Sequence, residues 1–358
     1  MLYSLVYGLR DHWAALNVFR YITFRALVAG LTALTLSLVL GPWLIRRLRA
    51  LQVGQAIRED GPAAHMTKKG TPTMGGTLIL FTCLGATLLL ADLAEWSVWL
   101  AVAVTLGHGM IGFLDDYAKV RRRNSKGIPG RVRLGAELAI GAAAASMIYL
   151  YSEHGGYLTT PFFKDLRPDL GLWYIPFGAL VIAGAANAVN LTDGLDGLAI
   201  GPVMIAGSTY AIFAYVAGNA RFAEYLQVPY VAGAGELVVF CSALAAAGLG
   251  FLWFNAYPAM MFMGDVGSLA LGAALGVVAL VTRQEMVLVV VGGVFVIETL
   301  SVIGQVASYK LRRKRIFRMA PIHHHFELLG WPEPQIIVRF WIVAIVCALL
   351  ALSTLKLR

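Results

Sequence analysis

The chain has 358 residues, of which 59% are hydrophobic and 14% are Asp, Glu, Lys or Arg, whereas ordinary soluble domains contain about 25% charged residues. A soluble protein of this composition would expose large apolar patches and aggregate, which excludes a cytosolic globular enzyme, a disordered protein and a disulfide scaffold. The class that remains is an all-α polytopic membrane protein, because helices that are hydrophobic all round are stable in lipid. The formal net charge is nevertheless +9, so the positions of the basic residues should decide the topology.

The N-terminal region predicts no removable signal peptide, because it mixes aromatic with charged side chains and has no short apolar core before a cleavage site. The first long apolar segment, residues 24–45, would be about 33 Å long as a helix and should remain as a membrane span. Cys83, Cys241 and Cys347 each lie in an apolar run, where we expect small hydrophobic residues rather than a redox or metal set.

Ten apolar segments are expected to cross the membrane as helices of a single domain, residues 1–358. They cover residues 24–45, 74–92, 96–114, 134–151, 173–189, 199–217, 236–254, 267–282, 286–309 and 336–355. The ninth segment contains the pair Gly292-Gly293 and the acidic Glu298, so we expect it to bend or break. Ten spans place both termini on the same side of the membrane.

Basic residues gather in the loops of one side. The loops after the first, third and ninth spans contain 19 of the 29 Lys and Arg residues, whereas the loops of the opposite side contain four. By the positive-inside rule the basic side is cytoplasmic, so both termini are expected outside, in the periplasm of a Gram-negative cell. A count of eight or nine spans would distribute the basic loops over both faces, which favours ten.

Acidic residues are scarce and lie close to the same face, where three short motifs hold five of the ten Asp residues. Asp115 and Asp116 end the third predicted span, where carboxylates oppose the helix macrodipole. A solvated helix end is the simplest interpretation of this pair. However, adjacent carboxylates repel each other, and either the basic residues that begin at Lys119 or a divalent metal ion could relieve the repulsion.

Amides and carboxylates recur every third residue in the second motif, at Asn187, Asn190, Asp193 and Asp196, and Gly194 breaks the helix beyond Asp193. Neighbours three residues apart share a helix face, so these side chains can converge at the mouth of a span. Helix capping by Asn or Asp explains one or two of the four. The spacing therefore favours a functional site.

Asp265 opens the eighth span. It could simply cap the helix, but a helix N-terminus flanked by Gly264 and Gly267 is also well suited to bind phosphate. A histidine triplet, His323 to His325, cannot face one direction. In an extended segment the first and third would share a side and the middle one would point away. A metal-binding tract is the weaker alternative, since zinc-site spacing is absent.

Together these motifs predict a site rich in oxygen ligands and surrounded by Lys and Arg at one membrane face. Oxygen ligands without thiolates select hard cations, and Mg²⁺ prefers one or two carboxylates together with substrate phosphates. We therefore expect two phosphorylated substrates, one soluble and one a lipid, with the lipid tail in an apolar groove beside the site. Metal and basic groups would stabilise the charge that develops in phosphoryl transfer. No nucleic-acid partner is expected.

Five strings carry a resemblance to a known family. They are Lys-Lys-Gly-Thr-Pro-Thr-Met-Gly-Gly (68–76), Gly-Phe-Leu-Asp-Asp-Tyr (112–117), Asn-Ala-Val-Asn-Leu-Thr-Asp-Gly-Leu-Asp-Gly-Leu-Ala (187–199), Phe-Met-Gly-Asp-Val-Gly-Ser-Leu (262–269) and Ala-Pro-Ile-His-His-His-Phe-Glu (320–327). In this order along the chain they resemble the bacterial phospho-N-acetylmuramoyl-pentapeptide transferases, the MraY translocases, within the polyprenyl-phosphate N-acetylhexosamine-1-phosphate transferase superfamily. The histidine run distinguishes this branch from relatives that use UDP-GlcNAc.

The resemblance implies ten spans with an outside N-terminus in the bacterial inner membrane. It also implies Mg²⁺-dependent transfer of phospho-MurNAc-pentapeptide from UDP-MurNAc-pentapeptide to undecaprenyl phosphate, which gives lipid I and UMP. On this sequence, Asp265 would bind Mg²⁺, Asp115 would be the base that deprotonates the lipid phosphate, and Asp116 would hold charge or metal beside it. His323 matches an essential histidine. The residues expected to bind substrate are Lys68, Thr73, Asn187, Asn190, Asp193, Asp196, Asn255, Phe262, Gln305, His324 and His325.

Other interpretations remain open at this point. A transferase that uses UDP-GlcNAc is the nearest rival. A secondary transporter would instead place polar residues near the bilayer midplane and show repeated halves. Gly272 and Gly276 form a small-xxx-small pair that could pack spans of one chain or the protomers of a homodimer, and packing within one chain is the simpler interpretation. Glu298 is either a packing residue or a functional one, because charge at bilayer depth is costly.

Overall fold

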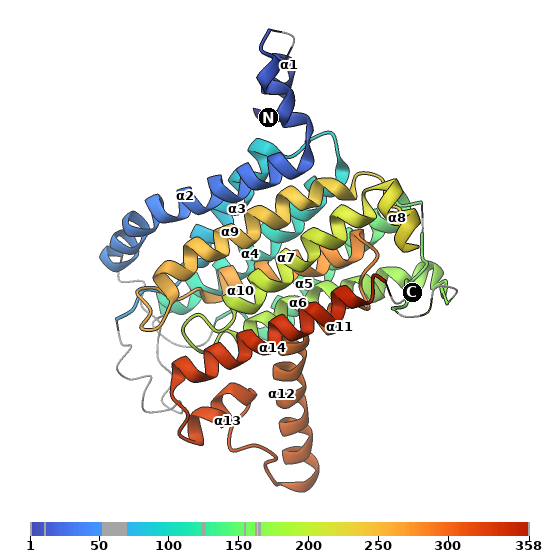
Figure 1. The fold of residues 1–358 in the computed structure, drawn as a ribbon. Coiled ribbons are helices and arrows are strands. Elements are labelled where there is room, and N and C mark those ends of the chain that lie inside the picture. The colour runs from blue at the N-terminus through green and yellow to red at the C-terminus, as the bar shows by residue number, and fades with distance from the viewer. Residues whose placement is uncertain are drawn as a thin grey trace.

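The computed structural model describes residues 2–10, 12–51, 70–122, 127–153, 155–161, 163 and 166–356, and the regular elements in these ranges are helices. In chain order they are α1 (Leu2–Gly8), η1 (Ala14–Arg20), α2 (Ile22–Ala50), α3 (Gly76–Leu90), α4 (Trp96–Arg122), α5 (Gly130–Tyr151), η3 (Gly171–Trp173), α6 (Tyr174–Thr192), α7 (Ile200–Ala217), α8 (Ala220–Leu226), η4 (Ala234–Glu236), α9 (Leu237–Asn255), α10 (Gly264–Val281), α11 (Leu288–Val291), α12 (Gly293–Arg312), α13 (Ile322–Leu328) and α14 (Glu333–Ser353). Figure 1 shows most of the long helices side by side in one bundle.

Nine helices in the described part of the chain are long and apolar enough to cross a membrane. They confirm the prediction of an all-α polytopic membrane protein. Helix α3 occupies the second predicted span and is apolar, but it has 15 residues. At 1.5 Å per residue it is roughly 22 Å long, shorter than a bilayer core of about 30 Å.

Helices α2 and α4 continue well beyond the predicted ends of their spans, residues 45 and 114. Helix α2 runs to Ala50 and α4 runs to Arg122, because the Arg and Lys residues that follow the apolar stretch are themselves good helix formers. The sequence had suggested that Asp115 and Asp116 lie at the end of the helix. They instead lie inside α4. The side chains of this last part of α4 can consequently point back toward the neighbouring helices.

The ninth predicted span is broken, as its glycine pair indicated. Helix α11 ends at Val291, and α12 begins at Gly293 after the interruption at Gly292. In Figure 1, α12 leaves the bundle steeply and carries α13 with it. The break therefore places the C-terminal half of this segment, and the loop after it, apart from the other long helices.

Helix α10 lies at the centre of the bundle, where it contacts α3, α4, α6 and α7. All of its residues from Val266 to Val281 are buried. It approaches α6 very closely, because a Cβ atom at Gly272 would lie 2.3 Å from the carbonyl oxygen of Ala185 and one at Gly276 would lie 2.9 Å from the Cα of Ile182. This confirms that the small-xxx-small pair packs helices within one chain.

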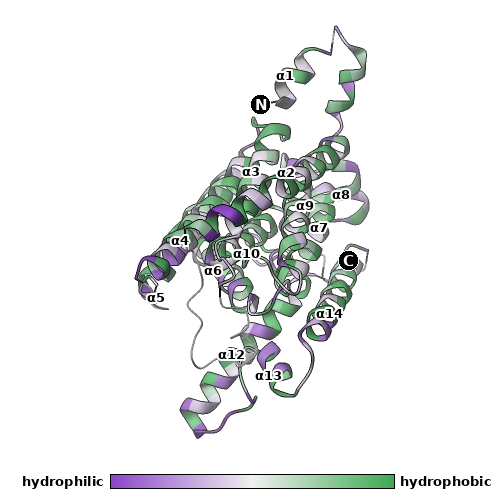
Figure 2. Cartoon of the chain, turned by 90° about the vertical axis from the view of Figure 1, so that its left-hand side faces the viewer, coloured by the Kyte–Doolittle hydropathy of each residue, from purple (hydrophilic) through white to green (hydrophobic). Residues whose placement is uncertain are grey.

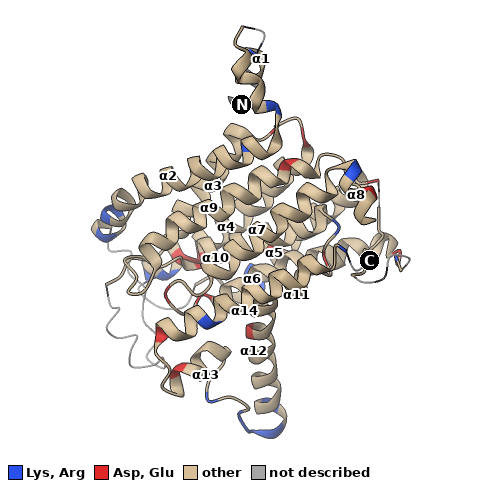
Figure 3. Cartoon of the chain, viewed as in Figure 1, with Lys and Arg blue, Asp and Glu red and all other residues tan. Residues whose placement is uncertain are grey.

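The outer helices present apolar side chains to their surroundings. Only 33%, 22% and 28% of the apolar windows of α2, α12 and α14 are buried, and Figure 2 shows hydrophobic residues over most of the bundle. Lys and Arg gather at the end of α2 and at the tip of α12 (Figure 3). Because apolar surface of this extent requires lipid as its solvent, the chain is a multi-pass membrane protein.

One ion pair is buried at the end of the bundle where α4 begins. Arg25 in α2 and Glu236 in η4 are 2% and 7% exposed, and both guanidinium nitrogens lie 2.6 Å from carboxylate oxygens. Glu236 also accepts a hydrogen bond from the backbone N–H of Asp92 at 2.8 Å. This pair joins α2, η4 and the loop before α4 through a contact in which one cation balances one anion and two hydrogen bonds connect them.

Candidate active site

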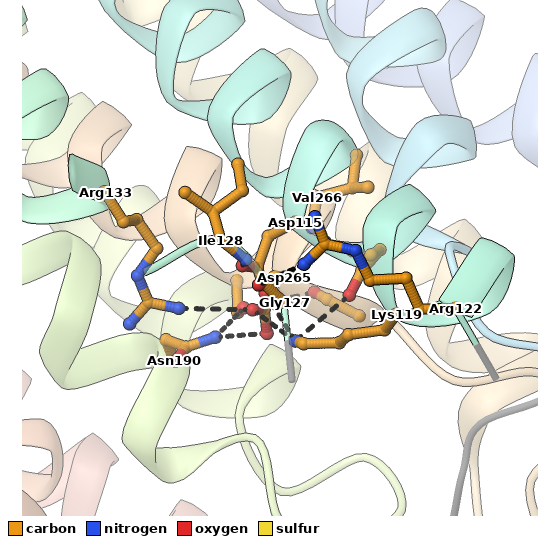
Figure 4. A network of polar contacts seen from close by, with 12 residues as sticks. Asp115, Lys119, Arg122, Gly127, Ile128, Arg133, Asn190, Asp265 and Val266 are labelled. Atoms are coloured by element: carbon orange, nitrogen blue, oxygen red, sulfur yellow. Dashed lines mark hydrogen bonds and ion pairs between the residues drawn. The ribbon is translucent and has the colours of Figure 1, made fainter. Parts of the chain in front are cut away.

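Three carboxylates meet at the other end of the bundle. Asp115 and Asp116 come from α4 and Asp265 from the first turn of α10, and their oxygens can lie within 4.8 Å of one another. The first two are 2% and 4% exposed, and Asp265 is half-buried. Figure 4 shows Asp115 and Asp265 among the polar side chains that meet here, including Lys119 and Arg133. The structure therefore brings the first and third motifs together, as the sequence indicated.

A glycine brings the two helices together. A Cβ atom at Gly112, one turn before Asp115, would lie 2.1 Å from the carbonyl oxygen of Asp265. Helix α4 therefore touches the N-terminus of α10 through its backbone. In the same region the backbone N–H of Val266 donates to Asp116 Oδ2 at 3.2 Å. This N–H group lies in the first turn of α10 and therefore has no partner within the helix. The positive end of the helix dipole also favours a carboxylate at this position.

Two cations neutralise part of the negative charge. Lys119 Nζ lies 2.6 Å from Asp115, 2.8 Å from Asp265 and 3.6 Å from Asp116. Arg133 Nη1 in α5 lies 3.3 Å from Asp265. Lys119 thus relieves the repulsion of the Asp pair, as the sequence suggested. Three carboxylates nevertheless face two cations, so the cluster carries an excess of negative charge that a further cation would neutralise.

Neutral donors fix the orientation of the carboxylates. The backbone N–H of Ile128 donates to Asp115 Oδ1 at 2.7 Å. Asn190 Nδ2 donates to Asp265 Oδ1 and to Ser268 Oγ, both at 2.8 Å. Because every carboxylate keeps at least one oxygen toward the others, the group presents several hard oxygen ligands on one side. This donor set fits a divalent cation such as Mg²⁺.

A second layer from α5 and α6 supports Arg133. Its Nη2 donates to Asn187 Oδ1 at 3.3 Å and its Nε lies 3.5 Å from Glu137, which is fully buried and accepts a hydrogen bond from Asn187 Nδ2. Arg133 was counted only among the basic loop residues, and Glu137 was not identified. Their four-residue spacing in an otherwise apolar segment was the available signal, because residues i and i+4 share a helix face.

The four polar residues of the second motif separate into two groups. Asn187 and Asn190 reach the carboxylate cluster, whereas Asp196 turns to the loop before α10, where its Oδ2 accepts from the backbone N–H of Ala259 at 3.0 Å. Asp193 caps the end of α6. The expected convergence of all four therefore holds for the amides and fails for Asp196, because the chain leaves the helix after Thr192.

Burial, reinforced by the negative charges of Asp265 and Asp116, raises the pKa of Asp193 to about 8. The neutral form of this carboxyl group is therefore favoured at pH 7, where an ordinary Asp is ionised. Burial is the main cause of this shift, and the negative charges of Asp265 and Asp116 act in the same direction. A cation bound nearby would favour the ionised form.

Other predicted residues hold the loops around this end of the bundle. Asn255 is 3% exposed; its Oδ1 accepts from the backbone N–H of Gly197 at 3.0 Å and its Nδ2 donates to the carbonyl of Met261 at 2.9 Å. Phe262 is half-buried, and its backbone pairs with Pro72 and Gly75 at 2.8 Å. These backbone contacts attach the start of α3 to the loop before α10.

Thr73 is 6% exposed and lies beside Gly264 and Asp116. A Cβ atom at Gly264 would lie 3.0 Å from Thr73 Oγ1 and 2.5 Å from Asp116 Oδ2, and Gly264 has a φ of +73°. Glycine is therefore required here both by space and by backbone conformation. Lys68 lies outside the described residues.

The histidine triplet begins a helix, α13, rather than an extended segment. Successive residues of a helix point about 100° apart, so the three rings face three directions. His323 is fully buried, and its Nδ1 lies 3.1 Å from Glu298 Oε1. His324 Nδ1 lies 2.5 Å from Glu327, and His325 Nδ1 accepts from the backbone N–H of Arg318 at 3.1 Å.

Gln305 holds the loop between α12 and α13. Its Oε1 accepts from the backbone N–H groups of Ile316 and Phe317 at 2.9 and 3.0 Å, and its Nε2 donates to the carbonyl of Phe317 at 2.9 Å. The side chain thus closes this loop. Gln305 therefore stabilises the loop that leads to the histidines of α13.

Residues 98–283 match glycosyl transferase family 4. Together with the helical bundle and its carboxylate cluster, this match defines the class as a polytopic membrane protein of that transferase family. Residues 68–80 match signature 1 of the phospho-N-acetylmuramoyl-pentapeptide-transferases. The chain is 58% identical to proteins of that name from Syntrophus aciditrophicus and Pelobacter propionicus and 57% identical to one from Geobacter sp. strain M21, in each case over 100% of both chains. It therefore belongs to the phospho-N-acetylmuramoyl-pentapeptide-transferase family, which confirms the resemblance.

Proposed function

We propose that this chain transfers phospho-MurNAc-pentapeptide from UDP-MurNAc-pentapeptide to undecaprenyl phosphate and thereby forms lipid I and UMP. The observation that carries the proposal is the cluster of three carboxylates and two cations at one end of a membrane bundle. Such a site suits the transfer of a phosphate-linked group between a soluble and a lipid substrate. The full-length relatives that bear the transferase name support the muramoyl substrate.

We further propose that Mg²⁺ is the cofactor and that Asp265, with Asp115 and Asp116, holds it. When bound, the ion would neutralise the charge of the diphosphate. Lys119 and Arg133 would bind phosphate oxygens beside it, since both already point into the cluster. Asp115 is the proposed base for the lipid phosphate. Because the second ionisation of a phosphate monoester lies near pH 6, much of this acceptor is dianionic at neutral pH, and positioning should contribute more than proton removal.

The remaining predicted residues are proposed to bind substrate around this centre. Asn187 and Asn190 would orient the groups next to Asp265. The loop of residues 193–197, the 193–197 loop from here on, would contact the nucleotide together with Phe262, which could stack on uracil. The other proposed contributors to substrate binding are Lys68, Thr73, Asn255, Gln305, His324 and His325, whereas His323 is proposed to support catalysis.

The whole chain is proposed to form one catalytic domain in the bacterial inner membrane, with the cluster at the cytoplasmic face and both termini outside. The basic ends of α2, α4 and α12 support this orientation. Membrane lipids are the proposed neighbours of the exposed faces of α2, α12 and α14. An apolar groove among them would hold the lipid tail, and one such face would serve a second copy if the protein is a homodimer.

A UMP-release assay tests this function. Full-length protein in detergent with undecaprenyl phosphate and Mg²⁺ should release UMP from UDP-MurNAc-pentapeptide and much less from UDP-GlcNAc. Removal of Mg²⁺ by a chelator should stop the reaction, and its return should restore it. Turnover with UDP-GlcNAc alone would assign the protein to the rival transferase, and no turnover with the muramoyl substrate would refute the proposal.

A further inference from the structure

Glu298 is a buried acidic residue for which the proposed chemistry provides no direct use. It lies in α12 among apolar residues and is fully buried. A carboxylate in such a place is costly unless a partner stabilises it. Its described partner is the ring of His323, whose Nδ1 lies 3.1 Å from Glu298 Oε1. The pair connects α12, which leaves the bundle, to the start of α13.

This contact fixes which nitrogen of His323 faces the substrate side. A carboxylate acceptor favours the proton on Nδ1 and leaves Nε2 without one, as in carboxylate–histidine pairs at metal sites. Nε2 has no hydrogen-bond partner among the described residues. It lies directly against Gly194, because a Cβ atom at that position would be 2.2 Å from Nε2. The ring therefore presses on the backbone next to Asp193.

The 193–197 loop is held at its other end by different residues. The backbone N–H of Gly197 donates to Asn255 Oδ1 at 3.0 Å. The indole N–H of Trp341 in α14 donates to the carbonyl of Gly197 at 3.2 Å. The backbone N–H of Asp196 donates to Glu333 at 3.0 Å. These contacts fix the loop near Asp196, whereas His323 packs against the loop near Asp193.

We propose that Glu298 is a positioning residue for nucleotide binding, which acts by holding His323 against Gly194 and thereby placing Asp193 and the 193–197 loop. This inference rests on the proposed function, because it takes that loop as part of the nucleotide site. His323 has no accessible surface in this arrangement, so its contribution passes through the loop. Glu298 lies farther still from the substrate and acts through His323.

The test measures kcat and KM for both substrates with full-length protein. In Glu298→Leu the apolar side chain fills the site but accepts no hydrogen bond, and KM for the UDP-linked substrate should rise at least about tenfold, the lower range for loss of such a supporting group. KM for undecaprenyl phosphate should stay within about twofold, because the proposal assigns this loop to the nucleotide. Glu298→Gln, whose amide oxygen still accepts from Nδ1, should restore the nucleotide KM to within about threefold of the wild type.

A double-mutant cycle separates this role from simple packing. Because Glu298 acts through His323, the variant with both Glu298→Leu and His323→Ala should be no worse than His323→Ala alone. Glu236→Gln, which alters a buried carboxylate at the opposite end of the bundle, should lower the melting temperature without changing either KM. Additive effects in the cycle, or an unchanged nucleotide KM in folded Glu298→Leu, would overturn the proposal and leave the transferase function standing. Absence of turnover in the wild type would refute the function and this inference with it.

Discussion

The two ends of α4 bury charge in opposite ways. Near its first residue, the cation Arg25 and the anion Glu236 form an ion pair with two hydrogen bonds of 2.6 Å. Near its last turns, Asp115, Asp116 and Asp265 face only two cations from the described chain, Lys119 and Arg133. From Trp96 to Asp115 a helix rises roughly 28 Å, so the two clusters lie near the two faces of a bilayer.

The difference in charge balance suggests a structural role for the first cluster and a functional role for the second. The first cluster satisfies its own charges, so its contribution is to hold α2, η4 and the loop before α4 together. The second leaves one negative charge unmatched and is partly accessible, with Asp265 at 16% side-chain exposure. An incomplete cluster of this kind is stabilised when a cation and phosphates complete it. This contrast supports the proposal that the active site lies at the carboxylate cluster.

The largest expected effect concerns the balanced pair. Arg25→Leu should leave the Glu236 carboxylate buried without its partner, and loss of one member of a buried ion pair costs about 3–5 kcal/mol. The melting temperature in detergent should fall strongly, while the activity per folded molecule stays unchanged. Replacement of both residues by apolar ones should recover much of the stability. Lost activity with full stability would mean that this end of the protein also belongs to the site.

The next effect concerns the unbalanced cluster. Asp265→Asn should lower turnover by at least about a hundredfold, the usual scale for loss of a principal electrostatic group. Its melting temperature should fall less than that of Arg25→Leu, because the reduced repulsion among the carboxylates offsets part of the lost attraction to Lys119 and Arg133. UMP release and thermal unfolding of the same preparation measure both quantities. If turnover stays within about tenfold of the wild type, Asp265 does not have the central role.

A matched pair of glycines tests how tightly the 193–197 loop is packed. Gly194→Ala places a methyl group 2.2 Å from His323 Nε2, and overpacking of this kind typically costs about 1–3 kcal/mol. Gly184→Ala in α6 meets nothing within 4 Å and should be neutral or slightly stabilising. Comparison of their melting temperatures and nucleotide KM values measures how closely His323 packs on this loop. Equal behaviour of the two variants would contradict the described position of His323.

The smallest effect concerns pH. The pKa of Asp193 is raised from 3.8 to about 8 in the folded protein, so the folded state holds a proton that the unfolded chain has lost above about pH 4. The stabilisation from this proton is complete below 3.8 and is lost as the pH rises through about 8. Without divalent cations, Asp193→Asn should therefore flatten the fall in melting temperature between about pH 5 and pH 8. An unchanged pH profile would contradict the raised pKa of Asp193 in the folded protein.

Local patterns predicted most of the fold and the centre of the site. Hydropathy located the helices, and the Gly292-Gly293 pair predicted the break before α12. The meeting of Asp115 with Asp265 followed from placing both motifs at one face. These features depend on short sequence windows, because lipid forces each apolar segment to satisfy its backbone as a helix.

Tertiary contacts could not be predicted in the same way. Glu137 joins the site only because α5 packs on α6 and brings it to Asn187. Asn255 and Gln305 form hydrogen bonds to backbone groups whose positions depend on loop closure. The contact of His323 with Glu298 joins residues that are 25 positions apart along the chain and belong to different helices. Such contacts depend on packing rather than on spacing.

We propose that the carboxylate cluster binds one divalent cation and that the Arg25–Glu236 pair binds none. Titration of full-length protein with Mn²⁺, followed by electron paramagnetic resonance, tests it most directly. The wild type and Glu236→Gln should bind one ion with equal affinity, whereas Asp265→Asn should bind it at least about tenfold more weakly, as expected when a ligand is lost. Equal binding by the wild type and Asp265→Asn would contradict the account.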